Sequence, residues 1–334
     1  MKLARILNGF QARFLVLPPI LFLLGTFVPA TPPPAIGPPA DAVVTVLAVP
    51  LDPDRPGLRR VGALVYLRGW ALRSPDRRFG GISAIQVADD RVTAISDVGV
   101  LLSFPLPQQA GALPLRVEPL RRGRIPDKTF HDTESLWIEG ARAWIGFERI
   151  NAVARYRRDG WRLESHARPR AMRGWRENLG AEAMARLPDG RFLVFAEEGS
   201  RGDRFSPVLL FDGDPADRDT PAAMLRYLRP PGYRLTDVAL LPDSRLLFLN
   251  RAFGFFEGPS ALLTVAAIGD IRPGATIEGR PIAELRSPLT VDNMEGLSVV
   301  REGGRTIVRL ASDDNFLALQ RSLLLEFALE ETAR

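Results

Sequence analysis

The sequence predicts an all-β protein folded as a β-propeller of five four-stranded blades, with six blades as the alternative. Three observations lead to this fold class. A hairpin of two strands with alternating apolar residues recurs five times along the 334 residues. Further strand-like segments follow each of the first four hairpins, which gives four strands per repeat, as in a propeller blade. No amphipathic helix longer than about two turns is evident in the sequence.

The clearest hairpin occupies residues 134–148 and turns at Glu139 and Gly140. Glu134 opens its first strand and Glu148 closes its second. Antiparallel pairing therefore places both carboxylates at the same end of the sheet. The distance from opening to closing polar residue is 14 in three copies (97−83, 148−134, 251−237) and 15 in a fourth (197−182). This near-constant offset indicates one repeated geometry.

The spacing of the hairpins indicates one propeller blade per repeat. The opening residues are Ser83, Glu134, Glu182, Asp237 and Glu295. Successive opening residues are 51, 48, 55 and 58 positions apart (134−83, 182−134, 237−182, 295−237). A propeller repeat of the common kinds spans ~40 to 50 residues. The period of the hairpins therefore supports the propeller prediction.

Residues 1–30 have the layout of a secretory signal peptide. Lys2, Arg5 and Arg13 precede an uncharged apolar run over residues 14–28, and small residues follow near Ala30. We expect export to the periplasm or the medium, with cleavage near Ala30. An uncleaved membrane anchor is the alternative, because the charge-free stretch continues through the proline-rich linker at residues 31–40.

Residues 41–334 are expected to form the propeller domain. Two strand-like segments, residues 42–49 and 61–72, precede the first hairpin, and a third strand at residues 323–329 follows the last hairpin. A closed ring completes its last blade with N-terminal strands, which removes an exposed sheet edge. We therefore expect the N-terminal strands to close the ring. A sixth blade built from residues 41–72 and the C-terminus is the alternative.

The composition limits the possible functions. Hydrophobic residues make up 46% of the chain, enough for a large core. The absence of cysteine excludes disulfides, thiolate metal sites and cysteine nucleophiles. The net charge of +5 comes mainly from scattered arginines. Nucleic-acid binding is not expected, because it requires a basic face interleaved with stacking aromatic residues.

Acidic residues at the hairpin ends are the main candidates for chemistry. Innermost strands of a propeller line its channel, so these acids are expected to meet at one mouth. Clustered carboxylates need raised pKa values, cationic partners or a metal. Oxygen ligands without cysteine favour Ca²⁺ over Zn²⁺. The candidate metal ligands are Asp97, Glu134, Glu148, Glu182, Glu197, Asp237, Glu295 and Asp313. The alternative is that each acid caps or bridges its own blade.

Other candidate groups surround these acids. His131 is a candidate general acid or base, with a solvated loop histidine as the alternative. Arg149 and Arg251 lie at or just after the closing positions and are candidate substrate-binding cations. No Gly-x-Ser-x-Gly elbow is present, so a serine triad is not supported. The acidic segment at residues 212–217 lacks the spacing of an EF-hand and is expected to be a turn.

Four pairs of motifs and one single segment resemble a known family. They are residues 79–83 with 95–97, 132–134 with 147–149, 178–182 with 196–197, 249–251, and 293–297 with 312–316. Their order and spacing resemble the phytase-like domain, also called the esterase-like activity of phytase family, from about Phe79 to Leu329. Two positions depart from the family pattern: Asn250 replaces an expected acid, and Val98 interrupts the usual Asp-Arg-Gly.

The resemblance implies a secreted β-propeller that hydrolyses phosphate or carboxylic esters with calcium held by channel acids. Our hypothesis is an exported, monomeric, metal-assisted hydrolase of a small-molecule ester or phosphoester. Glu134, Glu182, Glu295 and His131 are its candidate catalytic residues, and membrane contact is expected only if the leader is retained. One alternative is a non-catalytic periplasmic binding or scaffold propeller. The other is a lactonase-like hydrolase.

Overall fold

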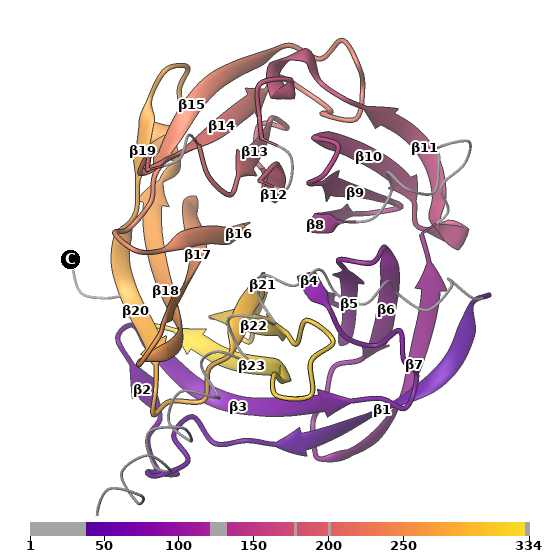
Figure 1. The fold of residues 1–334 in the computed structure, drawn as a ribbon, viewed down its shortest axis with the longest axis vertical. Helices are drawn as coiled ribbons and strands as arrows, with labels where there is room; N and C mark the ends of the chain where they lie inside the picture. Colours follow the sequence, from indigo (N-terminus) through magenta and orange to yellow (C-terminus); the bar gives the residue numbers. More distant parts are fainter. Residues whose placement is uncertain (1–37, 121–131, 177–178, 200–201, 331–334) are drawn as a thin grey trace, which may run out of the picture.

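Five antiparallel blades are arranged in a ring around a central axis (Figure 1). The computed structural model describes residues 38–120, 132–176, 179–199 and 202–330. Residues 1–37 and His131 lie outside the described residues, so the signal peptide, its cleavage and the place of His131 stay predictions. Among the described residues the only helical elements are short 3-10 turns, and no helix has the length and apolar character needed to cross a bilayer.

Four consecutive strands form each of the first two blades. Blade 1 contains β4 (Ile82–Ala88), β5 (Arg91–Ser96), β6 (Val100–Pro105) and β7 (Gly111–Pro119). Blade 2 contains β8 (Thr133–Glu139), β9 (Arg142–Phe147), β10 (Ala152–Arg157) and β11 (Arg162–Ala167). Two-residue turns with positive φ, such as Asp89 and Asp90 (φ 50° and 54°), connect strands with the twist that a hairpin requires.

The next two blades have the same order with one exchange. Blade 3 contains β12 (Ala181–Arg186), β13 (Phe192–Ala196), β14 (Phe205–Phe211) and β15 (Ala222–Leu228). Blade 4 contains β16 (Arg234–Leu240), β17 (Arg245–Gly254), β18 (Gly258–Ala267) and β20 (Arg280–Arg286). The short β19 (Thr276–Glu278) leaves blade 4 and pairs in parallel with β15, which joins the outer edges of the two blades.

Strands from both ends of the chain form the fifth blade. It contains β21 (Asn293–Glu302), β22 (Arg305–Asp313) and β23 (Ser322–Leu329), and β3 (Leu64–Arg73) pairs with β23 as its outermost strand. The short β2 (Arg60–Val61) pairs with β3. The N-terminal strands therefore close the ring, as the sequence predicts, and residues 41–72 do not form a sixth blade.

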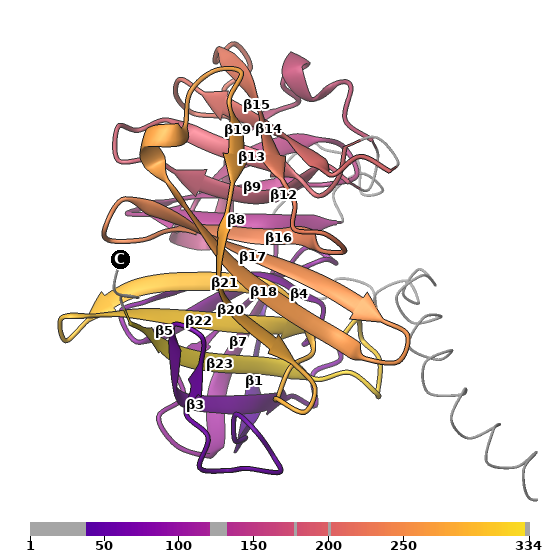
Figure 2. The same cartoon turned by 90° about the vertical axis from the view of Figure 1, so that its left-hand side faces the viewer.

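A further N-terminal strand extends this closure. β1 (Ala40–Ala48) pairs with β3 on one side and with β7 on the other. Blades 5 and 1 are consequently one continuous sheet of ten strands that bends round the lower part of the ring (Figures 1 and 2). This covalent and hydrogen-bonded connection removes the outer edges of both blades, where unpaired N–H and C=O groups would otherwise face solvent.

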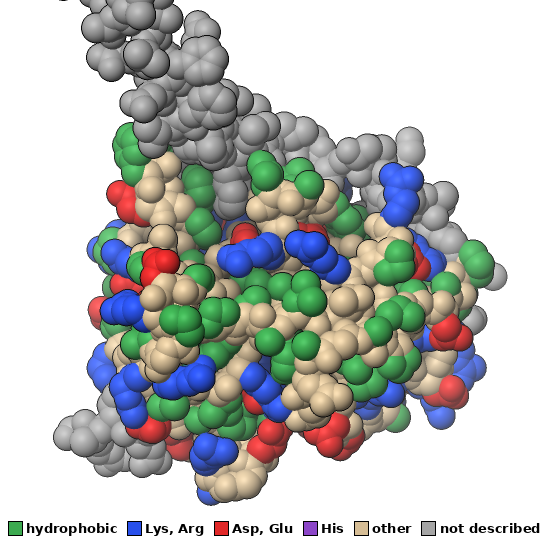
Figure 3. Space-filling view, turned by 90° about the horizontal axis from the view of Figure 1, so that it is seen from below, with side chains coloured by type: hydrophobic (Ala, Val, Ile, Leu, Met, Phe, Trp, Pro, Cys, Tyr) green, Lys and Arg blue, Asp and Glu red, His purple; other side chains and the backbone are tan. Residues whose placement is uncertain are grey.

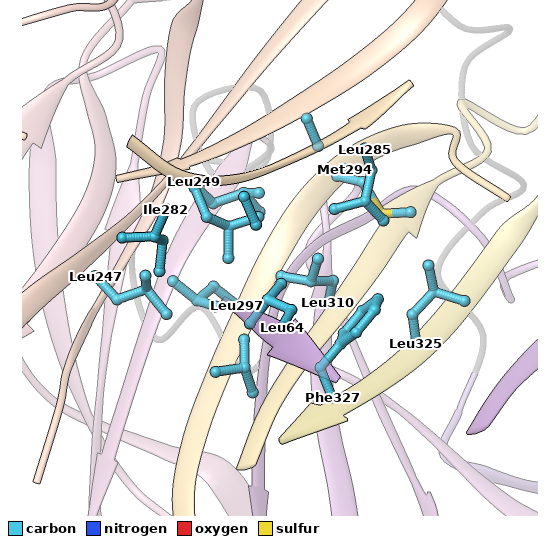
Figure 4. Close-up of a cluster of buried hydrophobic side chains, with 14 of the residues drawn as sticks. Leu64, Leu247, Leu249, Ile282, Leu285, Met294, Leu297, Leu310, Leu325 and Phe327 are labelled. Carbon is cyan, nitrogen blue, oxygen red and sulfur yellow. The ribbon is translucent and has the colours of Figure 1, made fainter. Parts of the chain in front are cut away.

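The hydrophobic core consists of five clusters of buried side chains, each between two neighbouring blades. The cluster between blades 4 and 5 includes Leu249, Leu310 and Phe327 and also takes in Leu64 from β3 (Figure 4). Face-to-face packing of neighbouring sheets therefore supplies most of the apolar burial, and the channel itself stays free for polar groups.

We expect Phe327→Ala to lower the free energy of unfolding by about 3 to 5 kcal/mol. Phe327 is fully buried, and its ring packs edge-on against Tyr66 of β3 at a centroid distance of 5.5 Å. The variant therefore weakens the closure of the ring. Chemical denaturation measures the effect, with Phe256→Ala as the control because Phe256 is 90% exposed. Equal stability of the two variants would contradict this account of ring closure.

Candidate functional site

Each innermost strand begins with a β-bulge. The pairing register with the second strand of the blade shifts by one residue near the start of β4, β8, β12, β16 and β21. The extra residue is Ser83, Glu134, Glu182, Thr236 and Glu295 in the five blades respectively. A bulge bends the strand and turns one side chain in a new direction. The same device is therefore repeated five times around the channel.

A second set of side chains comes from the end of each second strand. These closing residues are Asp97, Glu148, Glu197, Arg251 and Asp313. Their places are fixed by backbone contacts to the start of the innermost strand. Asp97 N–H donates to Gly81 O at 2.9 Å, and Glu148 N–H donates to Asp132 O at 2.9 Å. Gly81 has φ +60°, and a Cβ there would lie 2.3 Å from Asp97 Oδ1, so glycine leaves the space that Asp97 occupies.

One cavity of about 250 Å³ opens where the two sets meet. Nine of the ten bulge and closing residues line it, all except Thr236. Seven of these nine are acids from four blades: Asp97, Glu134, Glu148, Glu182, Glu197, Glu295 and Asp313. The structure thus brings together seven of the eight acids that the sequence suggested as metal ligands. The lining also includes Leu179, Arg234, Asn293 and Asn315.

Arg251 is the cation inside this acidic ring. Its guanidinium lies 3.2 Å from Glu197 Oε1 and 3.2 Å from Glu295 Oε1, and it donates to Asn293 Oδ1 at 2.8 Å. Burial disfavours its charge, but Glu295 and Glu197 outweigh that effect and raise the pKa of Arg251 further. Arg234 lies at the rim and pairs with Glu197 at 3.5 Å and with Glu198 at 2.8 Å. Arg251 therefore links blades 3, 4 and 5 across the mouth.

Burial and mutual repulsion raise the pKa values of most of the cavity acids. Burial and the neighbouring Glu197 raise the pKa of Glu148 to about 8. Burial and Asp132 raise the pKa of Asp97 to about 7. Burial also raises the pKa of Glu295 to about 7, although Arg251 opposes this shift. Several groups therefore titrate close to neutral pH, which is the range that general acid–base catalysis requires.

Three further acids hold their protons more strongly. Burial and Glu148 raise the pKa of Glu134 well above its usual range. Burial and Glu197 have the same effect on the pKa of Glu182. Burial and Asp97 do so for the pKa of Asp313. Like charges in a confined space disfavour simultaneous ionisation, so at neutral pH the cavity carries fewer negative charges than its seven carboxyl groups would suggest.

The sequence predicts Asp237 among the acids at the mouth, and this prediction is wrong. The bulge residue of blade 4 is Thr236, one position earlier, and its hydroxyl donates to Met294 O at 3.2 Å. The carboxylate of Asp237 instead accepts hydrogen bonds from Leu297 N–H at 2.7 Å and Val238 N–H at 2.8 Å. It is buried and joins blades 4 and 5, and it does not line the cavity. A one-residue slip of register accounts for the error.

The two substrate-binding arginines suggested by the sequence have different places. Arg251 lines the cavity, whereas the side chain of Arg149 is 52% exposed and pairs with Asp132 at 2.6 Å outside it. Asn250, where the family pattern suggested an acid, is fully buried and accepts a hydrogen bond from Tyr227 O–H at 3.0 Å. Asp214 of the acidic loop accepts from Trp144 Nε1 at 2.8 Å, so that loop is a structural turn.

The candidate residues chosen from the sequence did not include Arg234, Asn293 or Asn315, although the last two lie within the family motifs. With Thr236 as the bulge residue, the offset to the closing residue is 15 in both blades 3 and 4 (197−182, 251−236). Arg251 is therefore the closing residue of blade 4, as the sequence indicated, and only the opening residue changes. Arg234 and Asn293 pair with the closing residues of their own blades, Arg251 and Asp313, so a strand register would have placed both at the mouth.

The oxygen atoms of the side chains that line the cavity are suitable ligands for a hard cation. Carboxylate and amide oxygens are the ligands that Ca²⁺ prefers. Asp97 Oδ1 is buried and accepts no hydrogen bond within the described residues. The same residues contain no group of three acids or histidines already placed as metal ligands. Cation binding would therefore require side-chain rotation, and Ca²⁺ stays a prediction.

Comparison with known proteins identifies the family. The sequence pattern described as "Phytase-like: Esterase-like activity of phytase" matches residues 77–316, more than two thirds of the chain. The chain belongs to this family. The phytase-like match confirms the resemblance seen in the sequence and supports a hydrolase-type function. It also begins and ends close to the mouth, since β4 starts at Ile82 and Asn315 lines the cavity.

Other comparisons add less about this phytase-like protein. Among solved structures, glutaminyl cyclase from Myxococcus xanthus is similar, with a TM-score of 0.46 and 12% sequence identity. The match covers 81% of this chain and 97% of the cyclase chain. Comparison with curated protein sequences gives no significant match.

The raised pKa values predict that stability falls as pH rises above neutral. An acid whose pKa is higher in the folded state than in the unfolded state binds more protons when folded, so raising the pH favours unfolding. Between pH 6.5 and 8, Glu148 alone should contribute a loss of at most roughly 2 kcal/mol, because one pKa unit corresponds to about 1.4 kcal/mol. Thermal unfolding measured between pH 6.5 and 8 tests this prediction. It would be contradicted if stability did not change with pH, or if the Glu148→Gln variant showed the same pH dependence as the wild type.

Proposed function

We propose that this phytase-like propeller hydrolyses esters in the acid-lined cavity. The observation that supports the proposal is the convergence of seven acids and Arg251 from four blades on one cavity of about 250 Å³. Ester hydrolysis needs a base for water, an acid for the leaving alcohol and a donor for the developing oxyanion. The cavity contains groups of all three kinds.

Glu295 is the proposed general base. With a pKa of about 7 it is partly ionised at neutral pH, and Asn293 Nδ2 donates to its Oε1 at 2.9 Å. It would take a proton from water as the water oxygen attacks the carbonyl or phosphoryl centre. Glu148 is the proposed general acid, because a pKa of about 8 leaves it protonated at pH 7. Glu148 would donate its own carboxyl proton to the oxygen of the leaving alcohol.

Arg251 is the proposed oxyanion donor. It lines the cavity, and its guanidinium donates to Asn293 Oδ1 at 2.8 Å. Glu197 and Glu295 hold the guanidinium in place from two different blades. A preorganised donor of this kind needs no reorientation when negative charge develops on the substrate oxygen.

The charge of the cavity favours neutral esters over phosphate esters unless a cation is bound. Among the described lining residues, seven acids share the cavity with Arg234 and Arg251, so each acid that is ionised repels a phosphate group. We propose that Glu134, Glu182 and Asp313, with their neighbours, hold Ca²⁺ when phosphate esters are hydrolysed. Bound Ca²⁺ would neutralise carboxylate charge and polarise the substrate oxygen. Export to the periplasm through residues 1–30 is part of this proposal.

A non-catalytic binding propeller is the second candidate function. Glu197 and Glu295 already pair with arginines. Asp237, at the next position to a bulge, has a purely structural role in holding blades 4 and 5 together. If the remaining acids also serve only to bridge blades, the cavity binds a ligand without transforming it.

We expect Glu295→Gln and Glu148→Gln each to lower kcat/KM by about 10² to 10⁴. The substrates are p-nitrophenyl acetate and a δ-lactone as neutral esters, and p-nitrophenyl phosphate as a phosphate ester, each with Ca²⁺ and with chelator. Glu278→Gln is the control, because Glu278 is exposed and lies on β19 away from the cavity. Phosphate ester hydrolysis is expected only with Ca²⁺.

Two results would overturn this function. One is the absence of hydrolysis for all three substrates with and without Ca²⁺. The other is hydrolysis that neither variant slows. If ligand binding persisted in the first case, measured calorimetrically, the binding propeller would take the place of the enzyme.

A further inference from the structure

The mouth face carries a group of exposed arginines beside the acidic cavity. The loop between β11 and β12 contains Arg168, Arg170, Arg173 and Arg176, and no acid lies among residues 168–176. All four arginines are exposed, and none of their side chains forms an ion pair in the described part of the chain. By contrast, Arg234 at the rim of the cavity pairs with Glu198. Free, exposed guanidinium groups at this density favour an anionic partner.

Exposed apolar side chains lie on the same face, on the other side of the mouth. Strands β17 and β18 are ten residues long, and β17 continues beyond the cavity residue Arg251 to Gly254. At about 3.3 Å per residue the hairpin reaches roughly 10 Å past Arg251. Its tip holds Phe255 and Phe256, 39% and 90% exposed. Figure 2 shows this hairpin and the β22–β23 loop reaching out on the same side.

The β22–β23 loop adds a second apolar position. Leu319 in this loop is 70% exposed, and Asn315 of the same loop lines the cavity. Two neighbouring blades thus present bare apolar side chains around one opening. The wall formed by the lower blades differs, because positive, negative and apolar side chains are interspersed there (Figure 3). A tip of this kind is typical of a surface that meets an apolar phase.

The chain also joins the propeller on the mouth face. β1 starts at Ala40, which is paired with Val117 near the end of β7. Leu120, just after β7, donates its N–H to Gly99 O, two residues beyond the cavity residue Asp97. Arg78 Nη1 donates to Pro38 O at 3.0 Å. The apolar sequence at residues 14–28 therefore precedes a chain that enters the fold beside the mouth.

We propose that the mouth face docks on an anionic lipid bilayer, with Arg168, Arg170, Arg173 and Arg176 at the headgroups and Phe256 and Leu319 in the apolar boundary. Basic side chains combined with inserted apolar side chains are the features by which peripheral proteins bind such surfaces. A soluble polyanion would satisfy the arginines but leave the apolar tips in water. Docking is independent of hydrolysis, so its test does not depend on the proposed function.

The chain's lack of cysteine makes one experiment decisive. An environment-sensitive fluorophore is attached to full-length protein through Phe256→Cys, and separately through Met224→Cys on the outer strand β15. Met224 is 59% exposed but lies away from the mouth. With vesicles of phosphatidylglycerol and phosphatidylcholine, we expect a blue shift and quenching by lipid-embedded quencher at position 256 and neither effect at position 224. No response at 256, or equal responses at both positions, would overturn the proposal.

The arginines are tested by vesicle sedimentation of the full chain. We expect Arg170→Gln/Arg173→Gln/Arg176→Gln to weaken binding to these vesicles about a hundredfold, since each basic residue contributes about fivefold. The matched control is Arg218→Gln/Arg301→Gln/Arg305→Gln, three exposed arginines at the opposite face, one on a turn and two at the ends of β21 and β22. Equal binding of the two triple variants would contradict docking, and the apolar N-terminal sequence would then account for the binding to vesicles. Heparin binding without a response at position 256 would indicate a soluble polyanion and also overturn the proposal.

Discussion

The structure depends on closing a ring around side chains that repel one another. Glu134, Glu148 and Glu182 would separate in an open chain, but the bulged starts of the innermost strands hold them at one mouth. The opposing stability comes from the five interblade clusters and from β3, which completes the last blade. Packing far from the site thus maintains a local electrostatic strain that raises the pKa values of the cavity acids.

The innermost strands of neighbouring blades are joined close to the axis of the ring. Hydrogen bonds of side chains connect them there, in place of the backbone hydrogen bonds of a continuous sheet. Thr133 O–H donates to Ser96 O at 2.6 Å between blades 2 and 1. Val87 N–H donates to Ser298 Oγ at 2.9 Å between blades 1 and 5. Asp237 has this role between blades 4 and 5. Polar residues of the innermost strands therefore divide into those that join blades and those that face the cavity, and a shift of one residue separates the two roles.

Arg251 gives the cavity its chemical asymmetry. Four closing positions are acidic, and only blade 4 contributes a guanidinium. The acids next to it, Glu197 and Glu295, are ion-paired. Glu148, further round the ring, has a pKa of about 8 and is mostly protonated at neutral pH. Proton acceptors and proton donors are thereby separated across a small space, which is the arrangement that hydrolysis requires.

Much of the fold was predictable because hairpins repeat locally. The opening and closing positions of Glu134 and Glu148, and of Glu182 and Glu197, follow from alternation and turn residues alone. Two features were not predictable. The bridging of β1 between β3 and β7 depends on long-range pairing that no local pattern encodes. The register of β16 placed Thr236 instead of Asp237 at the bulge, because two adjacent polar residues fit the pattern equally well and only the packing against blade 5 distinguishes them.

The convergence of acids from different blades is tested most directly by the titration of one carboxyl group. ¹³C NMR follows the side-chain carboxyl of Glu148 in the wild type and in Glu197→Gln, with Glu278→Gln as the control. Glu197 belongs to the neighbouring blade and raises the pKa of Glu148. We predict a pKa near 8 in the wild type and the control, and a fall of about 1 or more in Glu197→Gln. The same pKa in all three proteins, or a wild-type value near 4.5, would contradict the account.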